Sequence, residues 1–189
     1  MVERSGEGPE NVGRRRWLAV SALGSSLLAL GSAAALLRTT GYDVTPSEAA
    51  RLRTLSAADY ALVRSLARRL VAPDVGAAPL ADEVGVAWFV DRYAGGLRAR
   101  LLRDFLHMLR FTEQVAPLSC GYLRRFTSLE AAQQDRVLAR LESSSIDDVR
   151  AGFQALKGVV MMGYYRDPRS FQILEYGGPL LAPREPSPP

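Results

Sequence analysis

The stretch LRARLLRDFLHMLR, residues 97–110, decides the fold class. Its apolar side chains recur every three or four residues and share one face of a helix, whereas most of its charged side chains share the other. The spacing predicts an amphipathic helix that ends before Pro117, because proline cannot continue a helix. The apolar face consists of Leu97, Leu101, Leu102, Phe105, Leu106 and Leu109, and the polar face of Arg100, Arg103, His107 and Arg110.

The segments on either side of this stretch repeat the helical pattern. A further helix is predicted from Asp82 to the pair Gly95-Gly96. No segment shows the sustained period-two alternation of a strand. The sequence therefore predicts an all-α, single-domain bundle of about five to seven helices, preceded by an N-terminal signal helix. Four capping boxes of the form Ser/Thr-x-x-Asp/Glu predict helix starts at Thr45, Ser56, Thr127 and Ser145.

The N-terminus has the pattern of an export signal. Arg14, Arg15 and Arg16 precede Trp17 and Leu18, and an uncharged apolar stretch follows over residues 19–37. The order of Arg14, Arg15, Trp17 and Leu18 resembles the twin-arginine (Tat) consensus. The apolar stretch is long enough to span a bilayer, but its serines and glycines dilute it. Two interpretations stay open: a cleaved Tat signal, or a retained membrane anchor.

Composition shifts predict four segments along the chain. Residues 1–37 form the Tat-type signal or anchor, and residues 38–54 a linker with a short helix. Residues 55–180 form the helical domain, and residues 181–189, rich in proline, a disordered tail.

The composition excludes several classes of site. The 189 residues include one cysteine, Cys120, and one histidine, His107, which excludes a disulfide framework and cysteine-rich zinc sites. His107 has no second ligand at a useful spacing and is interpreted as a surface residue. The net charge of +4 comes from arginines spread over all predicted helices, which argues against a nucleic-acid surface. We expect no metal, cofactor or catalytic residue in this chain.

Candidate interface residues are Cys120 and an aromatic-rich segment near the C-terminus. Cys120, an odd thiol in an exported protein, either pairs with another chain or is an inert buried thiol. The aromatic-rich segment after residue 163 is too irregular to be assigned to the core by periodicity. Its side chains either anchor a partner or pack back onto the chain's own helices. The members of this segment are Tyr164, Tyr165, Asp167, Pro168, Phe171, Tyr176 and Pro179.

Two regions resemble a known family. LSAADYAL at 55–62, continuing to LVAP at 70–73, resembles the opening helix of the gluconate 2-dehydrogenase subunit 3 family. MGYYRDP at 162–168 and YGGP at 176–179 resemble the ending of that family. The resemblance spans about residues 50 to 180 and includes the Tat-type leader.

The resemblance implies a small, non-catalytic subunit of an oxidoreductase complex. Its expected partner is a large FAD-containing dehydrogenase subunit of the glucose-methanol-choline class, which carries the flavin and the catalytic base. The small subunit is expected to assist maturation, stability and Tat export of that partner, in the manner of a chaperone, toward the periplasm or the outer face of the cytoplasmic membrane. A cytochrome subunit and the Tat translocase are further expected partners. The alternative is a membrane-anchored helical module that binds another envelope protein.

Overall fold

The computed structural model describes residues 41–71 and 78–174, and within them the chain is all-α with no strand. The predicted fold class, an all-α single domain of five to seven helices, is confirmed. The predicted signal helix and the predicted disordered tail lie outside the described residues. The α-helices are α2 (Pro46–Ala49), α3 (Ala57–Leu70), α4 (Ala81–Val84), α5 (Val86–Gly95), α6 (Ala99–Gln114), α7 (Ala131–Glu142) and α8 (Asp147–Tyr165). Short 3-10 helices are η1 (Ala116–Cys120), η2 (Phe126–Ser128) and η3 (Pro168–Leu174).

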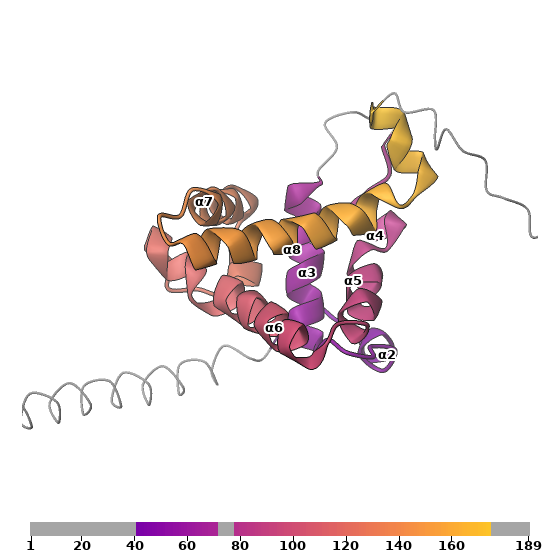
Figure 1. Ribbon diagram of the computed structural model, residues 1–189, viewed down its shortest axis with the longest axis horizontal. Coiled ribbons are helices and arrows are strands. Elements are labelled where there is room, and N and C mark those ends of the chain that lie inside the picture. The colour runs from indigo at the N-terminus through magenta and orange to yellow at the C-terminus, as the bar shows by residue number, and fades with distance from the viewer. Residues whose placement is uncertain (1–40, 72–77, 175–189) are drawn as a thin grey trace, which may run out of the picture. The chain divides into compact units, whose positions relative to one another are not determined.

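Helix α3 lies at the centre of the domain, and α8 crosses it (Figure 1). Helices α5, α6 and α8 all pack against α3, and its residues Leu62, Val63 and Leu66 are at most 1% exposed. Burying each such side chain stabilises the fold by about 1.5–3 kcal/mol. The long α8 also contacts α5, α6 and α7, so it joins both ends of the bundle.

The first two predicted capping boxes are confirmed. Thr45 accepts a hydrogen bond from the Glu48 N–H while the Glu48 carboxylate accepts the Thr45 N–H, and Ser56 and Asp59 repeat this exchange. Two backbone donors that a helix start leaves open are thereby satisfied at each site.

The other two predicted capping boxes are wrong. Helix α7 has Glu130 as its N-cap, and the Thr127 hydroxyl instead donates to the Glu113 carboxylate at 2.6 Å. Helix α8 has Ile146 as its N-cap, with no side-chain cap. Both the Thr127 hydroxyl and its backbone N–H donate to the buried Glu113 carboxylate, a partner 14 residues away that a local motif does not include.

The helix predicted from Asp82 to Gly95 is broken at Gly85. This glycine has φ 72°, in the left-handed region that residues with a Cβ rarely occupy, and it separates α4 from α5. The break lets α5 change direction and pack along α3.

A buried carboxylate fixes the turn before α3. Asp91, on α5, is 1% exposed and accepts the backbone N–H groups of Arg53, Thr54 and Leu55 at 2.8–3.3 Å. One side chain therefore satisfies three backbone donors and ties the entry of α3 to α5.

Helix α8 approaches its neighbours closely at two glycines. A Cβ at Gly163 would lie 2.8 Å from Phe89 Cδ1 and 3.2 Å from Val86 Cγ1, both on α5. A Cβ at Gly152 would lie 3.0 Å from Met108 Sδ on α6. Glycine is therefore required at position 163, within the MGYYRDP segment, for α8 to pack closely against α5.

Candidate interaction surface

The predicted interface residues of the C-terminal segment do not share one environment. Tyr164 is 1% exposed, lies in the chain's own core, and donates its hydroxyl to the Pro79 carbonyl oxygen at 2.9 Å. For this residue the structure shows the alternative left open above, packing onto the chain's own helices. Tyr165 is half-buried and stands edge-on to the Tyr164 ring, with centroids 5.2 Å apart.

The turn after α8 is held by Asp167. Its carboxylate accepts the backbone N–H and the guanidinium of Arg169, and these hydrogen bonds lower the pKa of Asp167 to about 2. The Asp167 carbonyl accepts the Ser170 hydroxyl at 2.7 Å. Pro168 is exposed and Phe171 is half-buried.

The other predicted residues are separate from this turn. Cys120 is half-buried at the end of η1, with its Sγ 3.9 Å from the Arg136 carbonyl oxygen. His107 is exposed on α6, in agreement with its interpretation as a surface histidine. The remaining predicted residues lie outside the described residues: Arg14, Arg15, Trp17, Leu18, Tyr176 and Pro179.

Within residues 41–71 and 78–174, no cluster of His, Cys, Asp and Glu side chains is suited to a metal ion. In the same part of the chain, no helix combines the length and the hydropathy needed to cross a bilayer.

Several large apolar side chains are exposed. Leu101 lies on α6 and Met162 on α8, Val115 and Ile146 are caps of these two helices, and Leu80, Leu118 and Leu123 lie on other segments. Of the six apolar-face residues predicted on α6, Leu109 is the one that is fully buried, whereas Leu101 is 48% exposed. The structure thus covers only part of an apolar face that the periodicity assigns as a whole.

A groove of about 260 Å³ lies between α6 and the middle of α8. Its lining is mostly apolar, and Asp104 is its one charged lining residue within the described part of the chain. The α6 wall includes Leu101, Phe105 and Met108, with Leu97 just before the helix, and the α8 wall includes Gly152, Ala155, Leu156 and Val159. We call this the α6–α8 groove.

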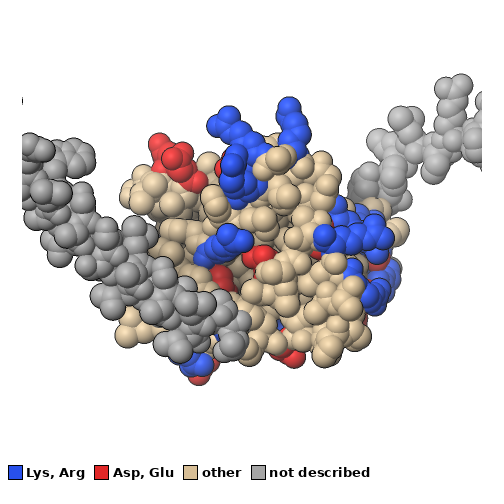
Figure 2. All heavy atoms as spheres, turned by 90° about the horizontal axis from the view of Figure 1, so that it is seen from below, with Lys and Arg blue, Asp and Glu red and all other residues tan. Residues whose placement is uncertain are grey.

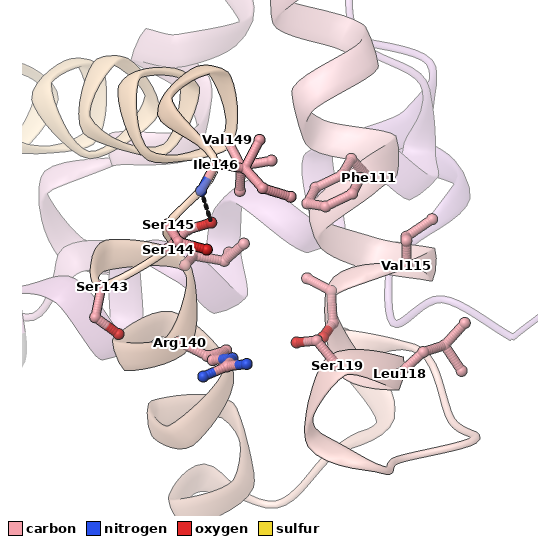
Figure 3. Close-up of a pocket in the computed structure, with 12 residues that line it drawn as sticks. Phe111, Val115, Leu118, Ser119, Arg140, Ser143, Ser144, Ser145, Ile146 and Val149 are labelled. Atoms are coloured by element: carbon pink, nitrogen blue, oxygen red, sulfur yellow. Dashed lines mark hydrogen bonds between the residues drawn. The ribbon is translucent and has the colours of Figure 1, made fainter.

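A second hollow, of about 520 Å³, lies where the end of α6 faces the turn between α7 and α8 (Figure 3). Phe111 and Val149 face each other at one end, and Ser119 and Arg140 at the other. At its rim Val115, Leu118 and Ile146 are 45–61% exposed. The Ser144 hydroxyl accepts the Ile146 N–H at 3.2 Å, so the turn itself is held.

The two hollows lie along the same pair of helices. On α6 the lining passes from Leu101 and Met108 in the groove to Phe111 in the second hollow, while on α8 it passes back from Val159 to Val149. Because these residues pair in opposite order, α6 and α8 run antiparallel, and both hollows open along one seam.

The outer face of α6 is basic. Arg100, Arg103, His107 and Arg110 are exposed, and within the described residues none of these arginines forms an ion pair. Figure 2 views the domain from the side where α6 and α2 lie in Figure 1, and more basic than acidic side chains project there. By helical position Arg100 and His107 lie beside the groove-lining Asp104, whereas Arg103 and Arg110 lie on the side of α6 away from the seam.

A buried polar cluster at the end of α6 was missed by sequence analysis. Glu113 is 4% exposed and accepts the Thr127 N–H and hydroxyl, with Arg125 3.8 Å away. The Arg125 guanidinium lies 4.1 Å from the centre of the Tyr42 ring. Burial raises the pKa of Glu113, and burial together with the nearby Glu113 charge raises that of Tyr42 to about 12. The cluster fastens the start of the domain to α6 and η2.

One comparison with known proteins gave a match. The family model described as gluconate 2-dehydrogenase subunit 3 matches residues 57–177, which include every helix from α3 to η3. No curated protein and no solved structure matches the chain.

Proposed function

Because this chain belongs to the gluconate 2-dehydrogenase subunit 3 family, we propose that it is a non-catalytic, accessory subunit of a dehydrogenase complex. The family match over residues 57–177 carries the proposal. The mostly apolar α6–α8 groove, with Leu101 48% exposed on its wall, supports it, because contiguous exposed apolar surface is typical of protein-binding sites.

The finer proposal names the partner. It is a large FAD-dependent subunit of the glucose-methanol-choline class, which carries the flavin and performs the oxidation. This chain assists its maturation and stability and supplies a Tat signal for both, so that the complex reaches the periplasm or the outer face of the cytoplasmic membrane. Arg14 and Arg15 are the residues on which export depends in this proposal. A cytochrome subunit is a further candidate member of the complex.

Affinity purification of the tagged full-length chain from its native host tests the partnership. We expect a flavoprotein of the glucose-methanol-choline class to co-elute and to account for all dehydrogenase activity of the sample. Recovery of the chain without a flavoprotein, together with a retained N-terminal segment, would favour the alternative of a membrane-anchored module that binds another envelope protein. Turnover by the purified chain alone would overturn the non-catalytic assignment.

Export is tested separately. The Arg14→Lys/Arg15→Lys variant is expected to leave the partner flavoprotein in the cytoplasm, because the Tat pathway requires the paired arginines. The matched control is Arg98→Lys, which changes an exposed arginine outside the leader. Non-reducing electrophoresis of the same complex decides between the two interpretations of Cys120: a covalent band that Cys120→Ser abolishes, or no such band.

A further inference from the structure

The α6–α8 groove has the dimensions and lining of a receptor for side chains. A cavity of about 150 Å³ holds a benzene ring, so about 260 Å³ accommodates one large aromatic or a pair of aliphatic side chains. Leu156 and Val159 form part of its floor and are 1% and 8% exposed, whereas Leu101 stands 48% exposed on its wall. The floor of the groove is thus buried, whereas its α6 wall is exposed to solvent at Leu101.

The outer face of α8 beside the groove is small and uncharged. Ala151, Ala155 and Gly158 are exposed at helical spacing, and a Cβ at Gly158 would meet nothing within 4 Å. Met162, 51% exposed, continues this face by one turn. Another helix can therefore approach the α8 backbone closely along Ala151, Ala155 and Gly158, where the side chains are small.

Two basic residues of α6 lie beside the groove. By helical position Arg100 and His107 adjoin the groove-lining Asp104, whereas Arg103 and Arg110 lie on the opposite side of α6. A binding element that covers the groove brings its own flank close to Arg100 and His107, and acidic side chains there would be complementary.

We propose that the α6–α8 groove receives an amphipathic helix of the large subunit, whose apolar ridge enters between Leu101 and Val159 and whose acidic flank faces Arg100 and His107. This inference rests on the proposed function, which supplies the partner. Recognition of this kind places apolar anchors at positions i, i+3 or i+4, and i+7 of the bound helix in a hydrophobic groove.

Two other occupants fit the groove less well. A second copy of this chain, joined by a two-fold axis, would present the same surface to itself and bring the unpaired arginine rows of two α6 helices together. An anionic bilayer would attract the arginines, but a bilayer is flat and leaves the recessed Leu156 and Val159 uncovered.

The test uses the complex purified from the native host. Leu101→Asp places a charge in the groove, and Ala155→Trp fills it. Both positions are exposed, so the fold tolerates both changes. Each variant is expected to lower recovery of the flavoprotein on the order of 30-fold, as expected when a central apolar anchor is lost. The matched control is Leu80→Asp, which alters a 56% exposed leucine at the N-cap of α4, outside the groove, and leaves recovery unchanged.

Circular dichroism and thermal melting of each variant show that it is folded. The Arg100→Glu variant is expected to weaken the complex about tenfold at low salt and less at high salt, since the pair it removes lies at the rim. Arg103→Glu, on the far side of α6, is the matched charge control. A photoreactive phenylalanine analogue at position 101 is expected to cross-link to a helix of the flavoprotein that carries acidic residues.

The outcomes separate this inference from the proposed function. A wild-type chain that binds no flavoprotein refutes both. A complex that survives Leu101→Asp and Ala155→Trp, or a cross-link from position 101 to a second copy of this chain or to lipid, overturns the groove assignment and leaves the accessory role intact.

Discussion

Two glycines of α8 provide a matched pair for testing how this helix is packed. Gly163 faces α5, where a Cβ would lie 2.8 Å from Phe89 Cδ1 and 3.2 Å from Val86 Cγ1. Gly158 faces outward, and a Cβ there would meet nothing within 4 Å. Both lie inside the helix, so replacement by alanine brings the same gain in helix propensity at each, about 1 kcal/mol.

The difference between Gly163→Ala and Gly158→Ala therefore isolates the steric cost at the α5 contact. Overpacking of this kind costs about 1–3 kcal/mol, because the Val86 side chain is fully buried and Phe89 packs against the core. We expect Gly158→Ala to be more stable than wild type by about 0.5–1 kcal/mol. Gly163→Ala is expected to range from unchanged to about 2 kcal/mol less stable than wild type.

The assay is urea unfolding of the full chain followed by far-ultraviolet circular dichroism, with thermal melts in parallel. A difference of 1 kcal/mol corresponds to a shift of about 2–4 °C in Tm for a chain of this size. Equal stability of the two variants, or greater stability of Gly163→Ala, would refute the close approach of α8 to α5.

Three further changes test single contacts. Asp91→Ala leaves the N–H groups of residues 53–55 without their acceptor and should cost about 2–4 kcal/mol, and Asp91→Asn, which keeps one acceptor oxygen, should cost less. Tyr164→Phe removes the hydrogen bond to Pro79 and should cost about 1 kcal/mol while flavoprotein recovery stays unchanged; lost recovery would place Tyr164 at the interface. Because burial raises the pKa of the Glu113 carboxyl above 4.5, the folded state keeps this proton where the unfolded chain has lost it. Stability should therefore fall as pH rises through that interval, and an equally steep fall in Glu113→Gln would exclude this cause.

Local patterns in the sequence were sufficient for the helices but not for the contacts between them. The capping boxes at Thr45 and Ser56 could be predicted because every partner lies within three residues. The hydrogen bonds of Asp91 and Glu113 could not be predicted, because their partners are 14 to 38 residues away. These contacts depend on how α5 and α6 pack. The break at Gly85 was missed since an isolated glycine inside a helical pattern is often tolerated.

The candidate interface could be predicted from the sequence only in part, for a related reason. The aromatic content of the segment after residue 163 suggested an interface, but Tyr164 lies in the core. Gly163 allows α8 to pack closely against α5, and Tyr164 donates a hydrogen bond to the loop before α4. The groove on α6 has no sequence motif. Its apolar positions look the same whether the chain itself or another protein covers them.

Helix α6 shows why that ambiguity is informative. Its apolar face is wider than the surface that α3, α5 and α8 cover. The uncovered part of this face forms the α6 wall of the α6–α8 groove. A chain that functions alone gains nothing from leaving Leu101 half exposed beside a recessed apolar floor, because exposed apolar surface of this kind promotes aggregation. A subunit that is covered by its partner avoids this cost. The exposed apolar wall of α6 therefore favours a partner that covers it. Leu101→Asp separates the two situations: it should make the isolated chain more soluble and lower flavoprotein recovery on the order of 30-fold.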